Sequence, residues 1–442
     1  MKISAQLEYI ESRFLKLLVD LSFLLIIVRG MKILTVHDTF PGQPRELLRV
    51  LGANPENDVR ALHRANVEAE IPGVKKVRYF PNAGGVSMVE PLYLFDQQVR
   101  AGYGVIRAAE KLKKEGFVPD IIFGHSGWGG TLFLREVFND APIGFNLEWY
   151  YNHRMDGKYK YRYVADNTSS FACARTKLMN CGWLQDFISA DRCLTATNFQ
   201  RAQFPGYMQE RIDVIHEGIN TVFFKPCARE KLTLPEIGLD LSEVQEIVTY
   251  ASRGLEEVRG FPEFMEAVYL LQQMRPKAHV IVAGDDKIFY GGMGSLPAGS
   301  TWKSLMLEKF KFDETRLHFV GKLNLEDYRK VLRCSSAHVY LSWPFVTSWS
   351  LLEAMSCEAL LVGSNTGGVQ EMIKDGENGI ILDIFDTENL AKTLAQILSR
   401  PKSYYSSLRK NARKTILENY RLEDCMRRKL QWLSKLTAMK TA

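Results

Sequence analysis

The feature that most constrains the fold of this chain is a repeated alternation of short apolar runs with longer amphipathic stretches. In the first half, apolar runs occur at Lys32–Val36, Pro119–Phe123 and Pro142–Leu147. The stretch Glu90–Gly116 places its apolar residues three and four apart, which predicts a long helix, and Gly127–Phe138 is expected to form the next one. Runs that are apolar throughout predict strands buried on both faces, and therefore a parallel sheet covered by helices on both sides.

The same alternation begins again in the second half of the chain. Strands are expected at Glu246–Ser252 and His279–Ala283, with a helix at Phe261–Met274 between them. The expected elements that follow are strands at Leu317–Val320, Ala337–Leu341 and Leu360–Gly363, and helices at Leu325–Cys334 and Ser350–Cys357. The sequence therefore predicts an α/β protein with two Rossmann-like, doubly wound domains that face each other across a cleft.

The domain limits follow from this pattern and from the proline breakers in Phe224–Gln245. Residues 31–225 are expected to form the N-terminal domain, 226–415 the C-terminal domain, and 416–442 a final helix that packs over the junction between them. In the basic, amphipathic stretch Leu408–Leu436, we expect Ile416, Leu430, Trp432 and Leu433 to pack, and Arg427, Arg428, Lys429 and Lys435 to stay in water. A membrane-surface role is the alternative for this helix.

Residues 1–30 form a separate extension. Its apolar part, Phe14–Val28, contains Lys16 and Asp20 and is short for a helix that spans a bilayer. No small-residue cleavage site follows it, which argues against a signal peptide. Three interpretations remain: a membrane-surface helix, a packed N-terminal helix, or a segment upstream of a natural start at Met31.

The composition excludes several classes of protein. With 46% hydrophobic and 24% charged residues the chain is ordinary for a globular protein and unlike a disordered one. A net charge of +6 over 442 residues is too weak to indicate nucleic acid as a partner. Seven cysteines without a CxxC pair argue against a disulfide framework and a zinc ribbon, and fit a reducing cytoplasm. No metal site and no GxGxxG loop for a nicotinamide cofactor are expected.

Polar residues and glycines follow the predicted strands of the first half, at the strand ends where open α/β sheets bind ligands. Gly42 allows close approach of the backbone to a phosphate or sugar, or simply makes a turn. His125 follows its strand in a glycine-rich loop and can bind a sugar hydroxyl or cap the next helix. Glu148 lies beside aromatic residues, which suits a sugar or a structural ion pair.

Charged residues take the corresponding places in the second half. Arg253 and Arg259 flank a strand–helix loop and can clamp a diphosphate, unless Glu256 and Glu257 pair with them locally. Glu353 lies about one turn into a helix, where a carboxylate can accept two ribose hydroxyls or complement the helix dipole. Gly367 and Gly368, followed by Glu371, end a loop that resembles a phosphate- or sugar-binding turn or is a plain turn.

Longer runs make these candidates more specific. Phe319–Lys322 (FVGK) and His338–Met355 (HVYLSWPFVTSWSLLEAM) resemble the donor-site signature of the retaining glycosyltransferases of family 4, which have the two-domain GT-B fold. Ile215–Asn220 (IHEGIN) resembles the segment before the interdomain linker of that family, and His37–Gln43 (HDTFPGQ) resembles the opening of one bacterial subgroup. The resemblance covers residues 31–435.

The resemblance implies a role for each matching residue. Arg253 and Arg259 would neutralise the donor diphosphate, Glu353 would hold the ribose, and His125 would contact the donor sugar near the reacting carbon. The other implied residues are Gly321, Thr347, Ser348, Gly367, Gly368 and Glu371 around the donor, and Gly42 and Glu148 on the acceptor side.

One position departs from the family pattern, because Phe345 stands where the first Glu of the Glu-x7-Glu pair is expected. That Glu touches hydroxyls of the donor sugar, so sugar recognition would fall to Thr347, Ser348 and backbone groups, or the site is degenerate. The implied enzyme moves a sugar from a nucleotide diphosphate donor to a glycan or lipid-linked acceptor. The anomeric configuration is retained and neither a metal nor a cofactor takes part.

The implied setting of this reaction is the synthesis of surface polysaccharide or glycoconjugate, in the cytoplasm, with peripheral contact at the inner face of the plasma membrane. Two alternatives remain. Phe345 favours a non-catalytic binding subunit with the same fold. An epimerase or a phosphorylase on this architecture is the other.

Overall fold

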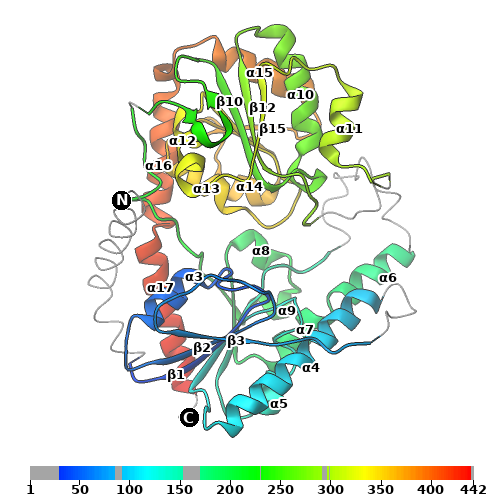
Figure 1. Cartoon of the computed structure of the whole chain (residues 1–442), viewed down its shortest axis with the longest axis vertical. Helices are drawn as coiled ribbons and strands as arrows, with labels where there is room; N and C mark the ends of the chain where they lie inside the picture. Colours follow the sequence, from blue (N-terminus) through cyan, green and yellow to red (C-terminus); the bar gives the residue numbers. More distant parts are fainter. Residues whose placement is uncertain are drawn as a thin grey trace. The chain divides into compact units, whose positions relative to one another are not determined.

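The computed structural model describes residues 29–84, 92–152, 170–228, 230–290, 296–297 and 299–439. The chain divides into two compact units (Figure 1). Unit 1 contains the described residues up to Gly218 together with those from Leu422 onward, and unit 2 contains the described residues from Ile219 to Arg421. The division thus falls seven residues before the boundary expected from the sequence. The apolar stretch before residue 29 lies outside the described residues, so its membrane role stays a prediction.

Unit 1 is built on a parallel sheet of seven strands in the order β3-β2-β1-β4-β5-β6-β7. Its strands are β1 (Lys32–Val36), β2 (Asp58–His63), β3 (Val74–Arg78), β4 (Ile121–His125), β5 (Ile143–Asn146), β6 (Arg192–Thr195) and β7 (Ile212–Val214). Its helices are α3 (Arg45–Gly52), α4 (Tyr93–Lys114), α5 (Leu134–Val137), α6 (Ser170–Met179), α7 (Cys181–Ser189), α8 (Asn198–Ala202), α9 (Gly206–Gln209) and α17 (Leu422–Ala438). The apolar patterns predicted β1, β4 and β5, but not the short or charged strands beside them.

Unit 2 contains a second parallel sheet, of six strands, in the order β12-β11-β10-β13-β14-β15. The strands are β10 (Ile247–Gly254), β11 (His279–Asp285), β12 (Leu317–Gly321), β13 (Ala337–Tyr340), β14 (Leu361–Ser364) and β15 (Ile380–Leu382). The helices are α10 (Phe261–Met274), α11 (Trp302–Lys309), α12 (Leu325–Cys334), α13 (Trp349–Ser356), α14 (Gly367–Met372), α15 (Thr387–Leu398) and α16 (Ser406–Asn419). A short antiparallel ribbon, β8 (Thr233–Leu234) with β9 (Leu239–Asp240), precedes the sheet.

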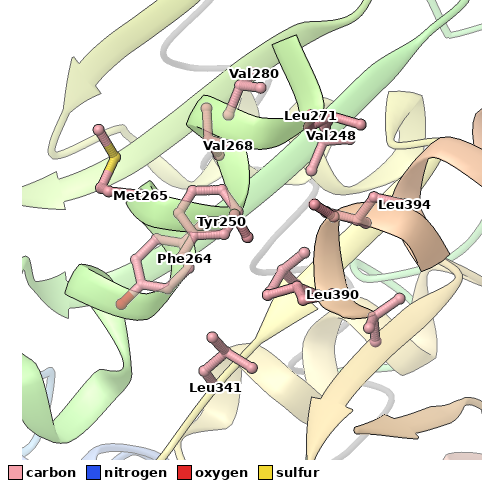
Figure 2. Packing of buried hydrophobic residues seen from close by; sticks show 14 of the residues in the cluster. Val248, Tyr250, Phe264, Met265, Val268, Leu271, Val280, Leu341, Leu390 and Leu394 are labelled. Atoms are coloured by element: carbon pink, nitrogen blue, oxygen red, sulfur yellow. The ribbon is translucent and has the colours of Figure 1, made fainter. Parts of the chain in front are cut away.

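Apolar clusters cover both faces of each sheet, as the continuous apolar runs predicted. In unit 2, the cluster in Figure 2 includes Val248 and Tyr250 of β10, Phe264, Met265, Val268 and Leu271 of α10, and Leu390 and Leu394 of α15. These side chains are fully buried or nearly so, and each one is worth about 1.5–3 kcal/mol relative to exposure to water. The opposite face is covered by α13, α14 and α16. Both sheets are therefore doubly wound.

One predicted helix is wrong. The helix expected at Gly127–Phe138 is reduced to α5 (Leu134–Val137), and the residues before it form a loop. Gly127 and Gly129 have φ values of +95° and +87°, which a right-handed helix excludes. A Cβ at Gly129 would also lie 2.1 Å from the carbonyl oxygen of Gln98. The loop after β4 is therefore tightly packed against α4.

The C-terminal stretch also differs from the prediction, because it forms two helices, α16 and α17, in two different units. Trp432 of α17 packs against Gly144 of β5, and its indole N–H donates to Asp213 Oδ2 at 2.8 Å. Lys429 was expected in water but is only 4% exposed. Burial lowers the pKa of its ammonium group, while the Glu217 carboxylate acts to raise it.

Candidate functional site

The predicted site residues of each unit lie near the carboxyl ends of the strands of its sheet. In unit 2, β10 carries Arg253 near its end, and a β-bulge between Ala251 and Gly254 interrupts its pairing with β11. A bulge re-aims the side chains of the strand that contains it. Arg253 is exposed, whereas Arg259, in the short 3₁₀ turn η3 (Glu257–Arg259) that follows, is only 5% exposed.

Neutral oxygen atoms hold the buried guanidinium of Arg259. Its Nη1 donates to the carbonyl oxygen of Val346 at 2.9 Å, to Ser342 Oγ at 3.1 Å and to the hydroxyl of Tyr340 at 3.4 Å. The hydroxyl of Tyr250 in turn donates to the carbonyl oxygen of Arg259 at 2.8 Å. These contacts fix the orientation of the guanidinium without cancelling its charge.

Aromatic rings surround both arginines. The Arg259 guanidinium carbon lies 5.3 Å from the ring centroid of Tyr290 and 5.5 Å from that of Phe345. The guanidinium of Arg253 lies 4.3 Å from the ring of Phe289. The rings of Tyr290 and Phe345 are 5.2 Å apart. Such cation–π contacts stabilise a cation and leave its hydrogen-bond donors available.

Neither Glu256 nor Glu257 neutralises these arginines, so the local pairing considered from the sequence is not formed. The buried carboxylate of Glu256 accepts hydrogen bonds from the backbone N–H groups of Phe289 and Tyr290, at 3.1 and 2.8 Å. Burial raises the pKa of Glu257 to about 7. Within the described residues, Arg253 and Arg259 have no ion-pair partner.

The loop after β13 connects Arg259 to the start of α13. Tyr340, which contacts Arg259, accepts the backbone N–H of Ser348 at 2.7 Å, and Ser348 caps α13 through its hydroxyl. Thr347 Oγ1 donates to the carbonyl oxygen of Gly368 at 3.1 Å. A cavity of about 10 Å³ is bounded by Arg259 and Ser348, among others. The structure therefore brings Arg259, Thr347, Ser348 and Gly368 together.

The remaining predicted donor residues lie at the same ends of the strands in unit 2. Gly321 ends β12 with a φ of +63° and open space around it, while Gly367 and Glu371 belong to α14, after β14. Glu353 is half-buried on α13. Burial, together with the carboxylate of Glu353 beside it, raises the pKa of Tyr328. Glu353 thus has a protein neighbour as well as the predicted ligand role.

In unit 1, two histidines lie at the ends of adjacent strands. His125 ends β4 and His37 follows β1, and their ring centroids are 4.7 Å apart. Burial lowers the pKa of His125 to about 4, against an opposing effect of Glu217. Burial and the neighbouring His125 lower the pKa of His37 to about 3. Both rings are therefore neutral at pH 7.

Amide and carboxylate groups adjoin these rings. Gln43 donates to Glu148 Oε1 at 2.7 Å and accepts from the amide of Asn146 at 2.8 Å. Glu148 Oε2 lies 3.7 Å from His125 Nε2, too far for a hydrogen bond, and within the described residues Nε2 has no hydrogen-bond partner. The amide of Gln200 donates to the carbonyl oxygen of Glu148 at 2.7 Å. This cluster can donate to and accept from hydroxyl groups.

Gly42 lies against this cluster at a position that only glycine can occupy without strain. Its φ is +58°, and a Cβ built on it would lie 2.5 Å from the ring of His37. His37 Nδ1 accepts the backbone N–H of Thr39 at 3.0 Å, which leaves the proton on Nε2. The glycine therefore allows the loop after β1 to close over the imidazole.

Asp186 of α7 supports the loop after His125. Its Oδ2 accepts from Ser126 Oγ at 2.5 Å and from Thr131 Oγ1 at 2.8 Å. Asp186 is fully buried, and burial raises its pKa to about 7 although these hydrogen bonds act to lower it. Asp186 was not expected from the sequence, because an isolated carboxylate in a helix has no distinguishing pattern. Asn146 and Gln43 were not expected either, although each lies within two residues of a predicted site residue.

Two further features are absent from the part of the chain that the structure describes. No helix in it is long and apolar enough to cross a bilayer. No group of three or more His, Cys, Asp or Glu side chains among the same described residues is arranged to hold a metal ion.

Comparison with known families gives two adjacent matches. Residues 55–224 match the model of the glycosyl transferase family 4 group, and residues 239–415 match that of the glycosyl transferases group 1. The chain belongs to glycosyltransferase family 4. This confirms the resemblance seen in the sequence.

Relatives and solved structures extend this family 4 assignment. The D-inositol 3-phosphate glycosyltransferase of Mycolicibacterium vanbaalenii is 26% identical over 48% of this chain and 46% of its own. This chain spans less than half the length of the first curated relatives that it matches.

Among solved structures, sucrose-phosphate synthase from Thermosynechococcus elongatus has a TM-score of 0.68 at 17% identity, over 92% of this chain and all of that one. Anabaena HepE, solved with UDP and glucose, has a TM-score of 0.64 at 15% identity over the same shares. At these identities the likeness shows the fold, which is GT-B as predicted.

Proposed function

We propose that this chain is a glycosyltransferase that moves a sugar from a nucleotide diphosphate donor to an acceptor hydroxyl, with retention at the anomeric carbon. The observation that carries the proposal is the pair Arg253 and Arg259, at the end of β10 and in the turn that follows, with no ion-pair partner among the described residues. A diphosphate is the kind of dianion that such a pair binds. The complex of Anabaena HepE with UDP, in a related fold, supports the same ligand class.

The two arginines would act on the leaving group. As the bond between the anomeric carbon and the diphosphate breaks, negative charge develops on the phosphate oxygens. Arg253 and Arg259 would stabilise that charge more in the transition state than in the ground state, which is the condition for catalysis. No protein base is assigned, and a phosphate oxygen of the leaving group would accept the acceptor proton. We propose that the reaction uses no metal and no cofactor.

His125 would bind a substrate hydroxyl. Its ring is neutral, so one nitrogen donates and the other accepts, and Nε2 has no hydrogen-bond partner among the described residues. The family resemblance assigns that hydroxyl to the donor sugar. We place Glu353 at the ribose, and Gly321, Thr347, Ser348, Gly367, Gly368 and Glu371 around the donor.

Gly42 and Glu148 would lie on the acceptor side. We propose a glycan or lipid-linked acceptor, in surface polysaccharide or glycoconjugate synthesis in the cytoplasm. The relative that is named for D-inositol 3-phosphate supports a small polyol phosphate as the competing class. Transfer of radiolabelled sugar to one class and not to the other, with the same donor, decides between them.

The first experiment is calorimetric binding of UDP, GDP, ADP and CMP to the wild type, Arg253→Ala and Glu353→Ala. We expect one diphosphate to bind, and each variant to lose about 1–3 kcal/mol, the value of hydrogen bonds to charged groups. Lys392→Ala, an exposed lysine paired with Glu388, is the matched control and should bind as the wild type does. Binding of no nucleotide would contradict the proposal.

Phe345 favours a second candidate, a binding subunit without catalysis. The ring occupies the place of the expected Glu and lies against Tyr290 and Arg259. In Phe345→Glu the new carboxylate would neutralise Arg259, so an active enzyme should bind its diphosphate about 3- to 10-fold more weakly, as expected for a partly exposed ion pair. Turnover that appears only in Phe345→Glu would instead establish the wild type as the binding subunit.

A further inference from the structure

A second polar cavity lies in unit 2, at the opposite ends of the strands. It has a volume of about 170 Å³, roughly ten times what one water molecule needs. Its polar lining comes from Gln245 and Glu246 before β10, Ser336 before β13, Arg400, Lys402 and Tyr405 between α15 and α16, and Arg409 in α16. The eight-residue strand β10 begins here and carries Arg253 near its other end, about 20 Å from its first residue.

Three cations line this cavity, and within the described residues their hydrogen bonds and ring contacts are with neutral groups. Lys402 Nζ donates to the carbonyl oxygen of Cys334 at 2.8 Å. Arg409 donates to the carbonyl oxygens of Ser336 and Glu358, at 2.6 and 3.0 Å, and its buried Nε has no hydrogen-bond partner among the described residues. The guanidinium carbon of Arg400 lies 5.3 Å from the ring centroid of Tyr404.

The cavity has little negative charge to balance these cations. The one carboxylate in its lining, Glu246, makes a two-pronged ion pair with Arg275, at 2.5 and 3.2 Å. Burial lowers the pKa of Arg409 to about 10, although the carboxylate of Glu358, outside the lining, acts to raise it. Burial and the charge of Arg409 also lower the pKa of Lys402. An anion in the cavity would relieve both effects, because it interacts favourably with each cation.

We propose that this cavity is a binding site for a small phosphate-type oxyanion, either free phosphate or the phosphate group of a small monoester. Arg400, Lys402 and Arg409 supply the charge. The hydroxyl of Tyr405 and the amide of Gln245, both at the cavity, supply neutral donors. The site is distinct from the pair Arg253 and Arg259, so it does not depend on the proposed transfer reaction.

The test is titration of the full chain with inorganic phosphate at constant ionic strength, followed by calorimetry and thermal unfolding. The wild type should show saturable binding. The double variant Arg400→Gln/Lys402→Gln should raise the dissociation constant at least about tenfold, since two charged hydrogen-bond donors are lost. This variant spares Arg409, whose bonds to two backbone carbonyls also support the fold.

Two matched variants test whether phosphate binding is specific to this cavity. Lys410→Gln removes a neighbouring exposed charge and should leave phosphate binding unchanged. Arg253→Ala removes a cation of the other cluster and should leave the phosphate binding that depends on Arg400 and Lys402 in place. Equal weakening by Lys410→Gln would overturn the proposal, as would loss of binding in Arg253→Ala with retention in the double variant. Absence of saturable binding up to about 20 mM phosphate would overturn it too.

Glycerol 3-phosphate in the same titration distinguishes the two sources of the anion. Tighter binding of the monoester supports a small phosphorylated metabolite as the ligand, and tighter binding of inorganic phosphate supports the free anion.

Discussion

The strand ends of the two units use the same architecture for opposite chemistry. In unit 1 they present neutral histidines, amides and the carboxylate of Glu148. In unit 2 they present Arg253 and Arg259 among aromatic rings. The doubly wound sheet therefore determines where polar groups collect, while a few loop residues determine their charge. We propose that the cluster of unit 1 binds hydroxyl groups and that of unit 2 a diphosphate, because of that difference.

The prediction with the largest expected effect concerns the two arginines of unit 2. We expect Arg259→Ala to lower turnover about 10²–10³-fold, the usual effect of losing one preorganised charge-stabilising donor. Arg253→Ala should have a smaller effect because Arg253 is exposed. Single-turnover kinetics measures both. An Arg259→Ala enzyme with normal turnover would show that the cation is structural.

Two glycines with similar backbone angles test how tightly each cluster is packed. Gly42 and Gly321 have φ values of +58° and +63°, but a Cβ at Gly42 would collide with His37, whereas open space surrounds Gly321. We expect Gly42→Ala to cost about 2–4 kcal/mol and Gly321→Ala about 1–2 kcal/mol. Urea unfolding measures both values. Equal losses in the free energy of unfolding would show that the loop over His37 can shift to accommodate a methyl group.

Glu256 and Glu257 are neighbours, but within the described part of the chain only the Glu256 carboxylate makes hydrogen bonds to residues that surround the arginines. Comparing variants of the two therefore tests whether Glu256 positions the arginine cluster. Glu256→Gln weakens the hydrogen bonds to the backbone of Phe289 and Tyr290, so we expect a loss of about 1–3 kcal/mol in the free energy of unfolding, with weaker nucleotide binding. Glu257→Gln should be nearly neutral in acid, because the pKa of Glu257 is raised to about 7 and the native carboxyl is already uncharged there. Denaturation and calorimetry at pH 6 compare the two variants. A nucleotide affinity unchanged in Glu256→Gln would contradict the positioning role.

The smallest expected effect is a pH dependence in unit 1. The pKa of Asp186 is raised to about 7, so the folded state binds more protons than the unfolded state from about pH 4 to pH 7. The stabilising contribution of Asp186 to the free energy of unfolding is therefore fully present in acid and is lost as the pH rises through 7.

We expect the stability of Asp186→Asn relative to the wild type to improve by about 2 kcal/mol between pH 5 and pH 7.5. Urea unfolding at both pH values measures it. The wild type is the reference because His37 and His125, whose pKa values are lowered to about 3 and 4, act in the opposite direction below pH 6.5. A difference between the two proteins that does not change with pH would contradict the assignment to Asp186.

Part of this site could be predicted because it lies where strands end. The apolar runs located β4 and β10, and so placed His125 and Arg253 at strand ends. The loop that replaces the helix expected after β4 was not predictable in the same way, because Gly127 and Gly129 adopt left-handed angles only against α4 and α7. Lys429 was misplaced because the apolar face of a helix does not show how deeply its flanking charges are covered.

By itself, the sequence determined the alternation of buried strands and helices, the presence of two sheets, and the family. Apolar periodicity and local turn residues act over a few positions, so they can be recognised in the sequence alone. The tertiary structure alone decided which charges are balanced. Glu256 binds the backbone of Phe289, 33 positions away, rather than either arginine, and Asp186 supports Ser126, 60 positions away. The cavity that Arg400, Lys402 and Arg409 line is completed by Gln245 and Ser336, more than 60 positions away. Such contacts follow from packing in three dimensions, and spacing along the chain does not encode them.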